Sequence, residues 1–165
     1  MKKFFNYATT LVLLAVCTFG ISSCGNDDDD LLKPGSMFGD WVSMTLQQNG
    51  NLLSLEIDNF NGNEVIGTVY KVYGTNIMQN MELNERAITK IEKYVNYGTF
   101  SYSGDNLSIT WPEGTFSGSI SFSNNGSDAV WRNQATTLNM GRPSGKVSTL
   151  VSRIETLYRL YFAGK

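Results

Sequence analysis

The chain has 165 residues with 13 basic and 15 acidic side chains, so its formal net charge is only −2. This near balance argues against the strongly basic surface by which many proteins bind nucleic acid, and we expect no nucleic-acid partner. The sequence contains no histidine and only two cysteines, Cys17 and Cys24. Zinc sites of the ordinary type and serine–histidine or cysteine–histidine catalysis are therefore excluded, because the commonest metal ligand and general base is missing.

The first 23 residues have the order of a secretory signal. Lys2 and Lys3 precede an apolar stretch at residues 11–19, and small residues follow it. A membrane-spanning helix needs about 20 apolar residues, which is roughly twice the length of this stretch. We therefore expect residues 1–23 to be removed as a signal peptide, together with Cys17.

The segment Ile21-Ser22-Ser23-Cys24 resembles the lipobox of bacterial lipoproteins, in which a branched apolar residue and two small residues precede an obligatory cysteine. The resemblance implies cleavage after Ser23, a diacylglycerol on the Cys24 sulfur and an N-acyl chain such as palmitate on its new amino group. Several acyl chains make a lasting anchor in membrane lipid. The mature chain would then have no free thiol and no disulfide. An ordinary secretory signal that is cleaved near a cysteine is the alternative.

Residues 24–36 predict an extended, solvated tether. The four aspartates at positions 27–30 repel one another and cannot be buried together. An acidic run close behind a lipidated cysteine resembles the export signal of surface lipoproteins in Bacteroidota-type bacteria. The resemblance implies the outer membrane, with the protein facing the cell surface. A periplasm-facing lipoprotein with a generic acidic spacer is the alternative.

Residues 37–165 predict one β-rich domain. Leu53, Leu55 and Ile57 alternate with polar residues, and similar alternation recurs at residues 100–102 and 107–111. Each such run offers one face for burial. Turns spaced about 8 to 12 residues apart favour a sandwich or an up-and-down barrel over alternating strands and helices. The predicted turns, rich in Gly, Asn and Asp, are residues 48–51, 61–63, 103–106, 112–114 and 124–127.

Two later segments have helical spacing. Residues 82–95 fit it in part, and we expect a short helix there, although two strands would also fit. The last segment fits it throughout, after a break at residues 141–145 in which Ser144 is a candidate cap. We expect this amphipathic helix to pack on the β-domain; lying on a membrane or a partner is the alternative. Its predicted apolar face comprises Val147, Leu150, Val151, Ile154, Leu157, Tyr158 and Tyr161.

Gly39-Asp40-Trp41 at the start of the first predicted strand resembles the Gly-x-Trp opening of lipocalin-like β-barrels. The resemblance covers most of residues 37–165. It implies a mainly β, antiparallel up-and-down barrel of about eight strands, closed at one end by Trp41 and flanked by the C-terminal α-helix. It also implies that Arg142 packs over Trp41, for which a cation–π contact supplies the physical reason.

The sequence favours binding over catalysis. Glu56, Asp58, Glu64 and Glu113 are scattered on positions that predict solvation, so we expect no catalytic or metal site and no cofactor besides the lipid on Cys24. The expected function is a non-enzymatic cell-surface module for a small hydrophobic or glycan-derived ligand. A protein-interaction or inhibitor subunit of an outer-membrane complex is the alternative. Because large aromatic side chains line apolar pockets, the candidate ligand-binding residues are Trp41, Tyr70, Tyr102, Trp111, Phe116 and Trp131.

Overall fold

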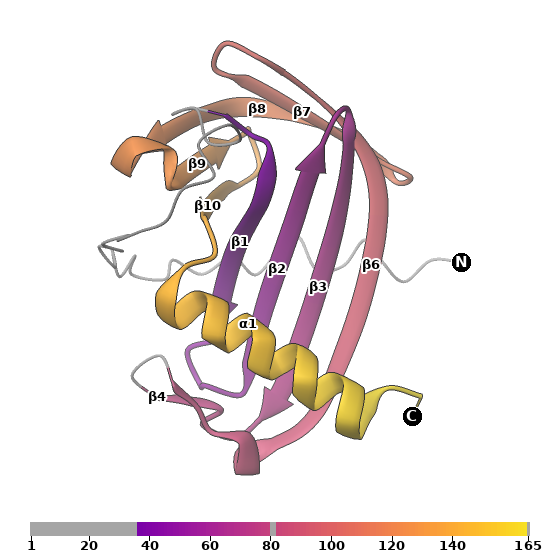
Figure 1. Cartoon of the computed structure of the whole chain (residues 1–165), viewed down its shortest axis with the longest axis vertical. Coiled ribbons are helices and arrows are strands. Elements are labelled where there is room, and N and C mark those ends of the chain that lie inside the picture. Colours follow the sequence, from indigo (N-terminus) through magenta and orange to yellow (C-terminus); the bar gives the residue numbers. More distant parts are fainter. Residues whose placement is uncertain (1–35, 80–81, 165) are drawn as a thin grey trace.

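The computed structural model describes residues 36–79 and 82–164, which form a closed antiparallel β-barrel with the helix α1 on its outer surface (Figure 1). Around the barrel the strand order is β1-β10-β9-β8-β7-β6-β3-β2. The prediction of an up-and-down barrel of eight strands with a C-terminal helix is confirmed. The predicted signal peptide, Cys24 and all of the tether except Ser36 lie outside the described residues.

The elements follow one another as hairpins, and the short strands β4 and β5 form a separate pair between β3 and β6. Each of the five predicted turns separates two strands. The strands are β1 (Gly39–Leu46), β2 (Leu52–Asn61), β3 (Glu64–Gly74), β4 (Met78–Gln79), β5 (Glu82–Leu83), β6 (Ile88–Ser103), β7 (Asn106–Trp111), β8 (Gly114–Ser123), β9 (Asp128–Arg132) and β10 (Thr137–Gly141). The helices are the 3₁₀ turns η1 (Glu85–Ala87) and η2 (Asn124–Gly126), α1 (Gly145–Leu157) and the π-helical turn η3 (Tyr158–Phe162).

One apolar cluster lies on the outer face of the long strands, beneath α1. In Figure 1 the helix crosses the face formed by β1, β2, β3 and β6. Leu150 and Ile154 of the helix are buried and pack with the strand cluster. The expected packing of the helix on its own domain is thereby confirmed. The buried strand residues of this outer cluster are Val42, Leu53, Leu55, Tyr70, Val72 and Ile91, joined by Ile77 from the loop after β3.

A second apolar cluster fills one end of the barrel interior. Residues that oppose each other on neighbouring antiparallel strands point to the same face, and successive residues alternate between faces. Trp41 opposes Asp58, and Asp58 opposes Gly67, so these three residues share the interior face. The buried members of the interior cluster are Met37, Trp41, Phe60, Val65, Leu107, Ile120, Ala129, Trp131 and Met140.

The prediction of a short helix over residues 82–95 is wrong. Apart from the single 3₁₀ turn η1, this segment contributes β5 and the first half of β6. Ile91 and Val95 occupy the outer face of β6, because they oppose Val72 and Thr68 of β3. Pairing along the whole length of β3 thus overrides a helical propensity that was weak.

The C-terminal helix follows its prediction up to its last turn. Ser144 is the N-cap residue, and its carbonyl accepts the Val147 amide, although its side chain forms no capping hydrogen bond. In η3 the backbone widens to a π-helical turn, so Phe162 packs on the outer cluster in place of the predicted Tyr161, which is 58% exposed. Within the described residues, no helix has the length and apolar character needed to cross a membrane.

Candidate functional site in the barrel interior

The closed end of the barrel is held by Trp41 and Arg142. The Trp41 side chain is fully buried, and its Nε1 donates to the Met37 carbonyl at 2.9 Å. The Arg142 guanidinium carbon lies 4.0 Å from the centroid of the Trp41 ring. Its Nη2 and Nη1 donate to the carbonyls of Ser36 and Asp40 at 2.9 and 3.2 Å. The expected cation–π contact is therefore present, and burial lowers the pKa of Arg142 to about 10.

The next layer of the interior carries two carboxyl groups, Glu56 and Asp58, which we call the inner carboxylate pair. Both side chains point inward from β2, since Asp58 opposes Trp41 and Glu56 opposes Ser43 on β1. Asp58 is only 4% exposed, and Glu56 is half-buried. The expectation that both carboxylates are solvated is wrong for Asp58. The apolar face of β2 turns outward to α1, so its polar face turns into the barrel.

Burial dominates the electrostatics of the inner carboxylate pair. Burial raises the pKa of Asp58 well above its usual value, and the nearby charge of Glu56 raises it further. Burial also raises the pKa of Glu56, against a smaller opposite effect of a hydrogen bond from Ser43. The Oδ1 atom of Asp58 is buried and has no hydrogen-bond partner in the described part of the chain. A polar atom in that situation costs stability.

Trp111 lies beside Asp58 because two strands carry glycine there. A Cβ atom on Gly67 would lie 3.0 Å from Asp58 Oδ1 and 3.0 Å from Trp111 Cη2. A Cβ atom on Gly98 would lie 2.6 Å from Trp111 Cε3. Any larger residue at either position would thus displace the indole. The Trp111 ring and the Asp58 carboxylate therefore flank the same point above β3.

Beyond this layer the interior face is no longer covered by β7. The pairing of β6 with β7 runs only from Thr99 to Ser103, whereas β6 pairs with β3 from Ile88 to Thr99. Figure 1 shows the lower parts of β1, β2, β3 and β6 extending past β7 and β8. We call this region the open half of the barrel. Its interior face carries Ser43, Thr45, Ser54, Glu56, Val69, Lys71, Tyr73, Lys90, Glu92 and Tyr94.

The rim of the open half is an ordered polar cluster around Glu92. This carboxylate accepts hydrogen bonds from the hydroxyls of Tyr73 at 2.8 Å and Tyr94 at 2.9 Å, and it lies 2.6 Å from the Lys90 ammonium. These three bonds lower the pKa of Glu92 to about 2, and the bond from Lys90 has the largest effect. The Lys71 ammonium lies 5.4 Å from the centroid of the Tyr94 ring. The rim thus combines aromatic rings with fixed charges.

The six aromatic residues that the sequence singled out do not surround one cavity. Trp41 is part of the packed interior, and so is Trp131, whose Nε1 donates to the Leu107 carbonyl at 3.2 Å. Tyr70 lies on the outer face under α1, where its hydroxyl is 3.4 Å from Glu155 Oε1. Burial, with Glu155 second, raises the pKa of Tyr70 to about 12.

The other three aromatic candidates differ in their exposure. Tyr102 and Phe116 point to the interior side of strands near the β7–β8 edge of the barrel, but they are 37% and 47% exposed. Trp111 lies beside Asp58 at the edge of the open half, whereas Trp41, which also neighbours Asp58, is fully buried in the packed end. The site therefore keeps one predicted residue and adds Ser43, Glu56 and Asp58. The signal for Glu56 and Asp58 was the polar face of β2, which becomes informative only once the opposite face of that strand is known to lie under a helix.

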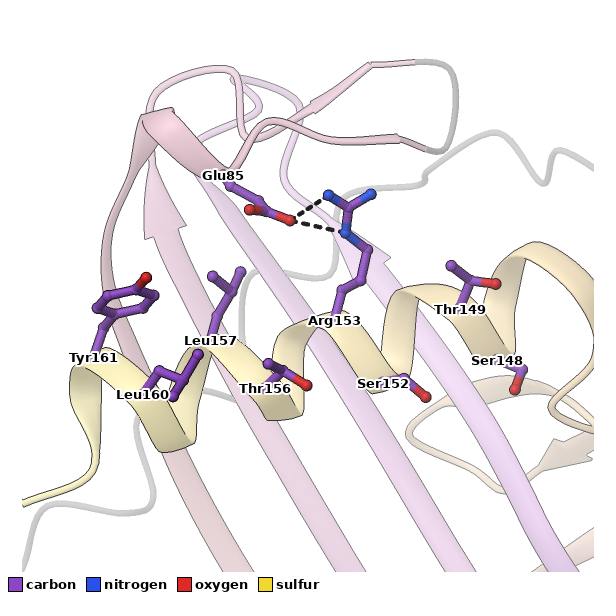
Figure 2. A pocket seen from close by; sticks show the side chains of 9 residues that line it. All are labelled: Glu85, Ser148, Thr149, Ser152, Arg153, Thr156, Leu157, Leu160 and Tyr161. Atoms are coloured by element: carbon purple, nitrogen blue, oxygen red, sulfur yellow. Dashed lines mark hydrogen bonds and ion pairs between the residues drawn. The ribbon is translucent and has the colours of Figure 1, made fainter.

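A groove of about 520 Å³ lies on the outer surface, between the exposed side of α1 and the η1 turn (Figure 2). Arg153 of α1 forms an ion pair across the groove with Glu85 of η1, in which Arg153 Nε lies 2.8 Å from Glu85 Oε1. Four hydroxyl-bearing side chains of α1 line the groove, and Leu160 and Tyr161 are exposed at its end. The groove contains no buried polar group comparable to Asp58 among the described residues. It is therefore the weaker candidate for a specific small-molecule site.

Comparisons with protein-family models, with curated proteins and with solved structures found no significant match to this chain. Within the described residues, no group of three or more His, Cys, Asp or Glu side chains is placed to hold a metal ion.

Proposed function

We propose that the protein is a lipid-anchored binding module without catalytic activity, which displays its barrel at the cell surface and holds a small ligand in the open half. The lipobox-like segment ending in Cys24 and the acidic run at residues 27–30 support the anchor and its location. The barrel with one packed end and one uncovered end supports the binding role. Aromatic rings beside hydroxyl and carboxyl groups suit a hydrophobic or glycan-derived ligand.

The observation that carries the proposal is the buried Asp58 carboxyl beside Trp111. A barrel whose only task was to be stable would gain by an apolar residue at this position, because an unpartnered buried polar atom costs about 1–3 kcal/mol. Binding sites commonly retain such groups because the ligand satisfies them. Asp58 lies at the boundary between the packed cluster and the open half, and the proposal places one end of the ligand against it.

Native mass spectrometry of the protein purified from its own membrane tests the proposal. We expect a bound small molecule as a discrete added mass. Val69 points into the open half opposite Tyr94, so Val69→Trp should abolish the added mass by filling the site. The matched control, Ser152→Trp in the outer groove, should retain it. Loss of the ligand from Ser152→Trp and not from Val69→Trp would overturn the proposal, as would the absence of any added small molecule in the wild type.

The outer groove favours the second candidate function, a protein-interaction or inhibitor subunit of an outer-membrane complex. Leu160 and Tyr161 are 67% and 58% exposed at one end of the groove, and aromatic side chains are common anchors at protein interfaces. The same mass spectrum distinguishes this function, because a stoichiometric protein partner adds a far larger mass. In that case Ser152→Trp should disrupt the complex and Val69→Trp should leave it intact.

A further inference from the structure

We propose that Glu56, Asp58 and Trp111 bind the ammonium group of a small organic cation, with the rest of the ligand lying in the open half of the barrel. This inference rests on the proposed function and deepens it by naming the chemistry of the ligand. The shared feature is a positively charged nitrogen on an apolar or sugar-like body, so that an aromatic amine and an amino sugar both belong to the class.

The charge of the site points to a cation. Two carboxyl groups face the same interior space, and neither forms a salt bridge with a described basic residue. The nearest candidates are already engaged, because Arg142 is held over Trp41 at the closed end and Lys90 is held by Glu92 at the rim. Lys71 is on the same face but lies over the Tyr94 ring. When the inner carboxylate pair is ionised, its negative charge is therefore not balanced by any described basic side chain.

The missing hydrogen-bond partner of Asp58 is a second, independent argument for a cationic ligand that donates hydrogen bonds. Its Oδ1 atom is buried, faces the interior and has no partner in the described chain. An ammonium group carries three N–H donors, which equals the number of side chains with acceptor oxygens on this face at Asp58, Glu56 and Ser43. Bonds from a charged donor to a carboxylate are also the strongest hydrogen bonds available to a ligand.

The neighbouring rings favour an organic ammonium over a metal ion. Trp111 flanks the same point as Asp58, and tryptophan faces attract organic cations within about 6 Å. The protein already uses this arrangement at its closed end, where Arg142 lies over Trp41. A calcium ion takes 6 to 8 oxygen ligands, whereas the described site supplies two carboxyl groups and one hydroxyl, and its indole ring supplies no oxygen ligand.

The proposal predicts a coupling between binding and protons. Burial raises the pKa of both inner carboxyl groups, and the nearby charge of Glu56 raises that of Asp58 further, so the pair holds a proton more tightly than free carboxyl groups do. A bound cation favours the ionised pair and should release that proton. The other titratable groups on the same interior face are Lys71 and Tyr73 on β3 and Lys90, Glu92 and Tyr94 on β6.

Isothermal titration calorimetry of the purified full chain with three matched probes tests this inference. The probes are 2-phenylethylammonium, the neutral 2-phenylethanol and the anionic phenylacetate. We expect the ammonium to bind at least about ten-fold more tightly than either other probe, because only it can form charge-assisted bonds to the pair. Titration in buffers of different ionisation enthalpy should show proton release on binding, and affinity should rise with pH through the titration of the pair. The same titration with glucosamine and with glucose distinguishes an amino sugar from an aromatic amine as the source of the ammonium group.

Two substitutions locate the effect. Asp58→Asn and Glu56→Gln keep the side-chain shape and should each lower ammonium affinity about ten-fold while leaving 2-phenylethanol unchanged. Glu113→Gln, in the exposed β7–β8 turn, is the control and should change neither. Equal binding of the ammonium and alcohol probes, or no binding of any ammonium probe, would overturn the inference. If native mass spectrometry still finds a ligand that Val69→Trp removes, the proposed function stands although the ammonium inference fails.

Discussion

Asp58 is a carboxyl group whose burial is expected to lower the stability of the domain. Its folded-state pKa is raised above the usual value of 3.8, so the folded protein holds a proton more tightly than the unfolded chain. The stabilising contribution is then complete below pH 3.8 and is lost as the pH rises through the raised pKa. We predict that Asp58→Asn increases the free energy of unfolding at neutral pH by about 1–3 kcal/mol, because it removes a buried ionisable group.

Urea denaturation from pH 4 to pH 8 measures this effect. The wild type should lose stability relative to Asp58→Asn as the pH rises, so the difference between the two proteins should grow across the range. Glu113→Gln, which changes an exposed carboxylate, should follow the wild type. A constant difference at all pH values would show that Asp58 does not titrate within this range.

The two interior residues Trp41 and Asp58 show what a sequence can and cannot reveal at this scale. The contact of Arg142 with Trp41 was expected because the Gly-x-Trp strand start resembles that of lipocalin-like barrels, in which a late arginine packs over the tryptophan. The burial of Asp58 was not predictable from an alternating strand, because alternation identifies two faces without saying which one is inside. Trp111 could be named as an aromatic, but its place beside Asp58 depends on the distant glycines Gly67 and Gly98.

At the scale of elements, α1 decides which face of the long strands turns outward. Ile154 is fully buried against the outer cluster, whereas Ser152, on the same helix, is exposed. We predict that Ile154→Ala lowers the free energy of unfolding by about 2–5 kcal/mol, the usual cost of a large-to-small change in a core. Ser152→Ala should change it by less than about 0.5 kcal/mol. Chemical denaturation checks both, and a small effect of Ile154→Ala would mean that the helix does not hold the sheet.

Element prediction failed where local spacing was ambiguous and pairing decided the outcome. The five turns were predictable because Gly, Asn and Asp accept the backbone conformations that tight turns need. The C-terminal helix was predictable because its apolar spacing repeats over several turns. The predicted apolar face is wrong at Tyr161, because the π-helical turn η3 places Phe162 against the outer cluster instead. Residues 82–95 became mostly strand because β3 offers them a continuous partner.

At the scale of the whole molecule, the buried face of α1 bears on the proposed attachment to a membrane. Leu150 and Ile154 are buried against the barrel, so the proposal assigns attachment to the acyl chains proposed on Cys24 and not to the apolar face of α1. We predict that Cys24→Ala moves the protein from the membrane fraction to the soluble fraction of expressing cells. Cys17→Ala, within the predicted signal peptide, is the matched control and should leave the protein membrane-bound. Immunoblotting of the two fractions measures the distribution. If the Cys24→Ala protein stayed on the membrane with its signal removed, a surface of the folded domain would have to hold it there, and the exposed Leu160 and Tyr161 would be the first residues to test.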